Sequence, residues 1–253
     1  HRVWGRLIGM MFALPMIFFF MRGMVPSGYK KHLVILLLLG ALQGFIGWWM
    51  VTSGFVDRTE VSQYRLAVHL GMAFLILGYL VWLALGLVFP IEEGRAAVPR
   101  GFRRLGGIAH EIIFFTVLSG ALVAGLGAGF AYNDWPFMDD NIIPDYIWEM
   151  EPWWLNFFEN IPTVQFDHRL LAYITIISVA ALWVWSRRIE LAPRARLSIN
   201  CLAVMLAMQV ALGISTLMLV VPIELAVLHQ GGAALTFSIA LWVMRELKGV
   251  PVK

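Results

Sequence analysis

Four histidines occupy matched positions in the two halves of this chain, and paired imidazoles of this kind are typical ligands of haem iron. In each half a His-Arg pair opens an apolar stretch, a Gln-x-x-x-Gly motif follows 41 or 42 positions later, and a Leu-Ala-Val motif then leads to a second histidine. The matched residues are His1, Gln43 and His69 in the first half and His168, Gln209 and His229 in the second. Because the ligand set recurs, the sequence predicts two equivalent cofactor sites, each with a haem iron between two axial histidines.

The composition places these histidines in a membrane. Hydrophobic residues make up 60% of the chain and charged residues 14%, whereas a soluble domain has about 25% charged residues. A helix needs about 20 apolar residues to cross a bilayer, and seven stretches qualify: 3–21, 33–52, 66–89, 105–131, 169–186, 197–221 and 224–244. The predicted fold class is therefore an all-α polytopic membrane helix bundle without a soluble domain.

The basic residues lie mostly on one side of the predicted membrane spans. Their distribution therefore predicts the topology of the protein, and the high pI does not indicate a nucleic-acid partner. Of the 19 Lys and Arg residues, 14 lie on the side of the spans that carries Lys30 and Lys31. The segment 132–166, on the other side, has seven acidic residues and no Lys or Arg. By the positive-inside rule this segment faces away from the cytoplasm or the matrix.

This topology gives the four matched histidines one depth. His1 and His168 begin spans at the outer face, and His69 and His229 lie a few residues inside spans that enter from that face. At about 1.5 Å per residue, all four lie within one or two turns of the boundary. A lone histidine in a span is usually a hydrogen-bonded core residue, but two matched pairs favour ligation of a cofactor.

The other two histidines lie outside this pattern. His32, at the inner boundary of its span, is expected at the membrane interface. His110 stands beside Glu111, and a structural contact between the imidazole and the carboxylate is expected there.

The repeat also predicts how the chain divides. We expect an N-terminal half at 1–104 and a C-terminal half at 105–253, arranged as tandem pseudo-symmetric bundles. The second half has four spans and the first has three, since the chain opens at His1 without a methionine. Parallel repeats with equal orientation need an even number of spans each. The sequence therefore predicts a helix before His1, and two bundles of four helices in the intact protein.

Several motifs match one family in order and spacing. They are HRVWGRLIG, QGFIGWWMVTSG, VSQYRLAVHLGMA, LSGALVAGLGAGFAYNDWP, FENIPTVQFDHRLLAY and LGISTLMLVVPIELAVLHQGGA. Over nearly its whole length the chain resembles haem A synthase of the proteobacterial and mitochondrial type. The resemblance implies an oxidoreductase, acting on a CH or CH2 group, that oxidises a methyl group of haem O to the formyl group of haem A for cytochrome c oxidase.

The resemblance also implies a role for each half. The N-terminal half would bind the substrate haem (haem O, then haem A), and His1 and His69 match its ligand pair and catalytic site. The C-terminal half would bind a haem b that feeds electrons, and His168 and His229 match its axial ligands. The family motif carries an essential glutamate three positions before the first histidine, which would lie just upstream of this chain.

Location and partners follow from the same resemblance. The expected location is the bacterial cell membrane or the mitochondrial inner membrane, with the histidine sites toward the periplasm or the intermembrane space. Besides lipid and haem O, the candidate partners are an electron donor, haem O synthase, cytochrome c oxidase assembly factors and a second copy of the chain. The formyl oxygen would come from water, by way of a diol formed through two-electron oxidations, or from an oxygen-activating route.

Polar residues near the histidines have more than one interpretation. Arg2 and Arg169 directly follow predicted ligands, and Arg65 lies about one turn before another. Each would bind a haem propionate as a cofactor-binding residue, or snorkel to the interface. Gln43 and Gln209 are expected to hydrogen-bond between helices or to a haem edge.

Two other function classes remain open. A di-haem b electron carrier would share the histidine pairs, but it would place its haems near both faces of the membrane, whereas the four histidines here share one depth. A transporter would fit the duplicated halves, but it would show charges at the midplane and interrupted helices. Extraction and identification of the bound pigment would distinguish an electron carrier, a transporter and a haem-modifying enzyme.

Overall fold

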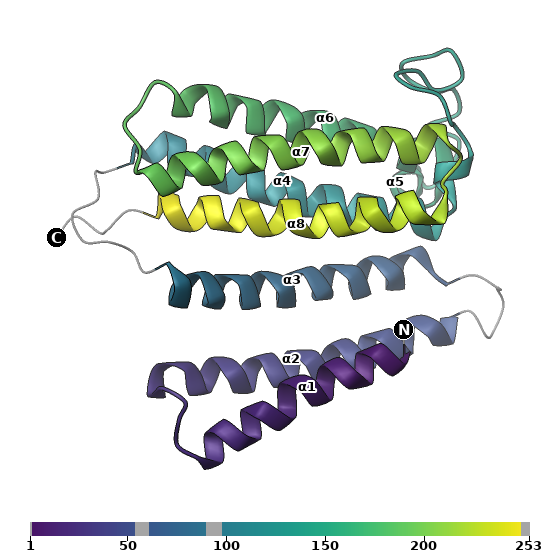
Figure 1. Cartoon of the computed structure of the whole chain (residues 1–253). Coiled ribbons are helices and arrows are strands. Elements are labelled where there is room, and N and C mark those ends of the chain that lie inside the picture. Colours follow the sequence, from purple (N-terminus) through teal and green to yellow (C-terminus); the bar gives the residue numbers. More distant parts are fainter. Residues whose placement is uncertain (1, 54–60, 90–97, 249–253) are drawn as a thin grey trace. The chain divides into compact units, whose positions relative to one another are not determined.

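The computed structural model describes residues 2–53, 61–89 and 98–248, and these form a helical membrane protein (Figure 1). Its helices are α1 (Arg2–Met21), α2 (Ser27–Thr52), α3 (Gln63–Val88), α4 (Arg100–Gly125), α5 (Asn156–Glu159), α6 (Ile161–Ser186), α7 (Pro193–Met218) and α8 (Ile223–Leu247). Seven of them are long and apolar enough to cross a membrane. The predicted all-α polytopic bundle is thus confirmed.

The helix that carries His168 begins earlier than the sequence suggests. Expected at 169, it starts at Ile161, because the Asn160 side chain caps it by accepting a hydrogen bond from the Thr163 N–H at 3.1 Å. Pro162 occupies a first-turn position, which suits its fixed φ. The expectation that His168 opens its helix is therefore wrong: it is the eighth residue of α6.

The helix α4 ends six residues before the predicted limit of 131. Gly127 has a φ of 62°, a left-handed conformation that glycine adopts without a steric penalty. The chain therefore turns out of the helix there, and a single 3-10 turn, η2 (Ala128–Phe130), follows.

The chain forms two compact units, at residues 1–80 and 81–253. The first contains α1, α2 and most of α3, and the second contains the remaining turns of α3 with α4–α8. In the second unit α4 packs on α6, α6 on α7, α7 on α8 and α8 on α4 (Figure 1). These four helices close a bundle in which α6 and α8 stand on a diagonal. The functional division at 1–104 and 105–253 rests on the sequence repeat and stays a prediction.

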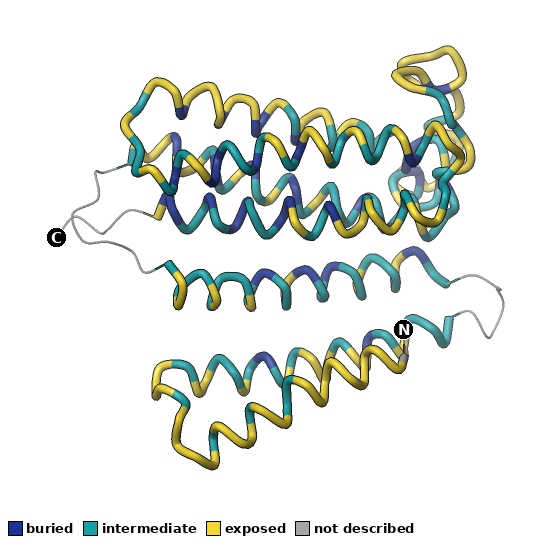
Figure 2. Tube along the Cα trace, in the orientation of Figure 1, coloured by how far each residue is buried: buried dark blue, intermediate teal, exposed yellow. Residues whose placement is uncertain are grey.

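The bundle of the second unit has polar contacts between some helices and large apolar side chains among its exposed residues. Figure 2 shows how exposed and buried positions alternate along its helices. The hydroxyls of Thr116 on α4 and Thr175 on α6 lie 3.0 Å apart. Leu170, Ile174 and Ile177 follow one face of α6 and are exposed. Hydrogen bonds inside and large apolar side chains outside are the arrangement expected of helices that pack in lipid.

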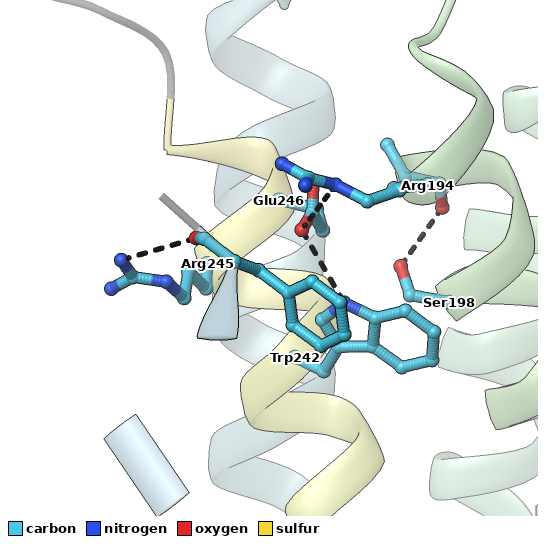
Figure 3. Close-up of polar contacts among 7 residues, drawn as sticks. Arg194, Ser198, Trp242, Arg245 and Glu246 are labelled. Atoms are coloured by element: carbon cyan, nitrogen blue, oxygen red, sulfur yellow. Dashed lines mark hydrogen bonds and ion pairs between the residues drawn. The ribbon is translucent and has the colours of Figure 1, made fainter. Parts of the chain in front are cut away.

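A buried ion pair holds the end of the bundle that lies far from the second-half histidines (Figure 3). The Glu246 side chain is 1% exposed, and its Oε1 lies 3.4 Å from Arg194 Nε of α7. The same oxygen accepts a hydrogen bond from Trp242 Nε1 at 3.3 Å, and Trp242 stacks on Phe89 with ring centroids 6.0 Å apart. Because a buried carboxylate needs such partners, this cluster sets how α7 and α8 meet.

Candidate functional site

His168 is held by a hydroxyl on the neighbouring helix α4. Its Nδ1 lies 2.8 Å from Ser119 Oγ, and Ser119 Oγ lies 2.8 Å from the Thr116 carbonyl oxygen. A serine hydroxyl has one proton and a carbonyl can only accept. Both bonds therefore form together only when Ser119 donates to Thr116 and the His168 Nδ1–H donates to Ser119. This tautomer leaves Nε2 without a proton, as iron ligation requires.

His229 is held by a glutamine on α7. Gln209 Nε2 donates to the His229 main-chain carbonyl at 2.8 Å and lies 3.2 Å from the His229 ring Nδ1. His229 is the seventh residue of α8 and His168 the eighth of α6. Because α6 and α8 are diagonal in the bundle, the two imidazoles come from facing helices at matching positions, as in haem-binding bundles.

His69 in the first unit repeats the arrangement of His229. It is the seventh residue of α3, and Gln43 Nε2 of α2 donates to its main-chain carbonyl at 3.0 Å. Gln43 and Gln209 each lie nine residues before the last residue of their helices. The predicted interhelical hydrogen bonds of both glutamines are confirmed, and the two halves share a structural motif as well as a sequence motif.

A glycine lies beside each described histidine of the repeat. A Cβ atom at any of these glycines would lie 2.8 to 3.1 Å from the imidazole Cε1, closer than real Cβ atoms come without displacement of the ring. The pairs are Gly47 with His69, Gly120 with His168, and Gly213 with His229. Each glycine lies five residues before the last residue of its helix. The absent side chain is what lets the imidazole approach the neighbouring helix.

These features of the second unit fit a haem held by His168 and His229. The His168 Nδ1–H donates to a hydroxyl, which is the usual way in which a second contact orients a metal-binding imidazole, and His229 also has a polar partner at Nδ1. Gln209 Oε1, on the residue that contacts His229, is buried without a hydrogen-bond partner in the described part of the chain, and so is Arg169 Nε on the residue after His168. A bound molecule with polar groups would satisfy such atoms.

The glycine beside His229 gives a testable prediction. Gly213→Ala should displace the His229 ring and lower the affinity for haem by about tenfold, the range seen when the support of a metal ligand is disturbed. Gly231→Ala on α8 is the matched control, because a Cβ at Gly231 meets nothing within 4 Å. Haem retained on purified protein measures both. Equal retention in the two variants would show that the close approach has no bearing on the site.

Arg169 ties α6 to the segment that connects α4 and α6. Its Nη1 donates to the Phe137 carbonyl at 2.8 Å, and its Nη2 donates to the Tyr132 carbonyl at 3.2 Å. Burial, and then the charges of Asp139 and Asp145, raise the pKa of Tyr132, so the phenol in this segment stays neutral at ordinary pH. A contact between Arg169 and a haem propionate stays a prediction.

The remaining predicted residues of the first unit are placed only in part. His1 and the side chain of Arg2 lie outside the described residues. Arg65 Nη1 donates to the Trp49 carbonyl at 2.7 Å, and its guanidinium carbon lies 4.6 Å from the centroid of the Trp49 ring. Arg65 thereby joins α3 to the end of α2, close to His69 in the sequence.

The histidines outside the repeat have protein partners. His32 Nδ1 lies 2.6 Å from the Tyr79 hydroxyl oxygen, within the first unit. His110 Nδ1 lies 3.4 Å from Glu111 Oε1, which confirms the predicted structural contact. These two histidines serve as internal controls for substitutions at the repeated ones.

The structure adds Ser119 and the three glycines to the residues that sequence reasoning found. Gly47 and Gly213 were visible as the last residue of the Gln-x-x-x-Gly motif, yet the motif gave no reason for a glycine there. Ser119 and Gly120 form an adjacent pair near the end of α4. Gly120 lies as far from its helix end as Gly47 and Gly213 do, and this equal distance is the signal that could have found it and its neighbour Ser119.

Comparison with known proteins shows the family. Residues 1–241 match the family described as cytochrome oxidase assembly protein. Proteins named heme A synthase from Nitrosospira multiformis and Nitrosomonas eutropha are 48% and 45% identical to it, over 98% of this chain and 70% of their own length. The heme A synthase of Bos taurus is 41% identical over 99% of this chain and 62% of its own length. With this match over nearly all its residues, and with repeated histidines on matched helices, the chain belongs to the family of cytochrome oxidase assembly proteins that includes the heme A synthases.

Proposed function

We propose that this member of the haem A synthase family oxidises a methyl group of haem O to the formyl group of haem A, and that its two halves have different roles. The observation that carries the proposal is the pair His168 and His229, which come from diagonal helices of one bundle at matching positions. The names of the relatives support the product.

The C-terminal half would hold a haem b. When bound, this group would supply an iron that takes up and releases single electrons. His168 and His229 would be its axial ligands, while Ser119 keeps the proton of His168 on Nδ1 and Gly120 makes room for the ring. A haem held by these two imidazoles would suit electron transfer.

The N-terminal half would hold the substrate haem through His69 together with His1. Gln43 and Gly47 support His69 as Gln209 and Gly213 support His229, and this likeness favours an equal ligand role. Conversion of methyl to formyl is a four-electron oxidation. It balances either as R–CH3 + H2O → R–CHO + 4 H+ + 4 e−, with an external electron acceptor as oxidant, or as R–CH3 + O2 → R–CHO + H2O, with molecular oxygen as oxidant. The resemblance assigns catalysis to a carboxylate just upstream of His1.

Extraction of the pigments tests the proposed function. The full-length protein is produced in bacterial cells that lack their own haem A synthase and contain haem O synthase. We expect haem A in the cell extract, and haem b on the purified protein, both identified by chromatography and mass. Haem b without any haem A would favour the di-haem electron carrier, and absence of pigment would favour a transporter.

We also propose that the acidic segment 132–166 and the histidine ends of the spans face the periplasm or the intermembrane space. The sorting of basic residues supports this orientation. Cys201 is the only cysteine, so Asn141→Cys and Arg188→Cys can be made singly in a Cys201→Ser background. An impermeant thiol reagent added to intact bacterial cells should label position 141 and not 188. Labelling of 188 alone would reverse the orientation.

A further inference from the structure

The two histidines of the second unit have different partners at the same ring atom. Around His168 Nδ1 lie the Ser119 hydroxyl, whose proton is directed at the Thr116 carbonyl, and that carbonyl itself. The hydroxyl oxygen accepts from the ring, because its own proton goes to that carbonyl. The hydrogen bonds therefore favour a single tautomer of His168, with its proton on Nδ1 and a bare Nε2.

His229 Nδ1 meets a donor as well as an acceptor. The side-chain nitrogen of Gln209 lies 3.2 Å from it, and the main-chain carbonyl of Gln209 is also within reach of the ring. The amide cannot be turned over, because its nitrogen donates to the His229 carbonyl at 2.8 Å and a flip would bring two oxygens together. The donor favours the tautomer with the proton on Nε2, the atom that iron would need.

We propose that Ser119 and Gln209 make these imidazoles unequal iron ligands, so that His168 is the permanent ligand and His229 the ligand that exchanges. This inference rests on the proposed function, since it needs a haem between the two residues. The physical reason is that a partner that accepts the Nδ1 proton strengthens an imidazole as a ligand, whereas a partner that donates to Nδ1 competes with the form that binds. A small molecule should therefore enter the iron on the His229 side.

Carbon monoxide binding to the reduced, purified full-length protein measures this difference, because carbon monoxide can bind only after a histidine has left the iron. Ser119→Ala should speed binding by about tenfold, since His168 loses its acceptor and also begins to exchange. Gln209→Met should slow binding by about tenfold, since the Nδ1–H of His229 then meets only the main-chain acceptor. The two variants thus move the rate in opposite directions.

Matched variants separate this effect from general damage. Ser178→Ala on α6 removes a hydroxyl that donates to the Thr175 carbonyl at 2.9 Å, in the same local geometry as Ser119. It should leave the carbon monoxide rate unchanged. Ser119→Thr keeps the hydroxyl and should bind carbon monoxide at the wild-type rate. Rates that change in the same direction in Ser119→Ala and Gln209→Met, or that match the controls, would overturn the proposal.

A second measurement, the retention of haem in glycine variants of the two histidines, tests the same proposal if Gln209→Met does not fold. His229→Gly should retain haem and bind added imidazole, while His168→Gly should lose haem to apomyoglobin at least tenfold faster. Equal loss from both variants would contradict unequal ligands. The spectrum of the wild-type protein is recorded before carbon monoxide is added. If it lacks the low-spin bands of a haem with two histidine ligands, the proposed function itself is refuted.

Discussion

His168→Ala and His229→Ala should each abolish the low-spin spectrum of haem b in the full-length protein, with the greater loss of haem in His168→Ala. Each change removes one of the two proposed ligands, and His110, the other described histidine of the second unit, is not part of the repeat. We expect the affinity for haem b to fall at least tenfold in His168→Ala, the range for loss of support around a metal, and to fall less in His229→Ala. The optical spectrum and the haem-to-protein ratio of purified protein report both effects.

The control for this prediction is His110→Ala in the same unit. His110 contacts Glu111 at 3.4 Å and belongs to α4, but it is not part of the repeated pattern. It should retain haem b with an unchanged spectrum. If His110→Ala lost haem as completely as His168→Ala, the loss would reflect damage to the bundle and the ligand assignment would not stand.

His69→Ala should stop the conversion of haem O to haem A while haem b remains bound. The reason is that the residues around His69, namely Gln43 and Gly47, lie in the first unit, whereas His168 and His229 lie in the second. Substitutions that share no interaction partners have largely independent effects. Haem A in cells that express the variant should fall at least a hundredfold, as measured by chromatography of extracted haems.

His32→Ala is the matched control for His69→Ala. It removes an imidazole from the same unit, one that bonds to Tyr79 and not to the repeat, and it should leave haem A production within about twofold of the wild type, since only a structural hydrogen bond is lost. Continued production of haem A by His69→Ala at the normal rate would show that the first unit does not hold the substrate through this residue.

The number and place of the membrane helices were predictable because their cause is local. A span is a run of apolar residues, and the seven runs correspond to the seven long helices. The ends of the helices were harder to predict from the sequence. The start of α6 at Ile161 depends on the Asn160 cap and on Pro162, within a polar run that hydropathy alone assigns to a loop.

The histidines were predictable for a different reason, which is repetition. Two imidazoles at corresponding places in two halves are improbable as accidents of packing, so His168 and His229 stood out without any contact being known. Their supports did not stand out in the same way. Ser119 acts through a bond between α4 and α6, and a pairing between distant segments leaves no local pattern of hydropathy or charge.

The place of His168 and His229 along their helices has a consequence for bioenergetics. Both lie about 10 Å from the start of a helix whose 25 or 26 residues cross the whole membrane. The near face of the membrane is the one at which α6 and α8 begin. An electron that reaches the histidines from this face crosses the smaller part of the transmembrane voltage. An electron from the opposite face crosses the larger part. A full crossing is worth about 2.3 kcal/mol per charge at 100 mV. The reduction of the site should therefore respond only weakly to membrane energisation when its donor sits on the near side.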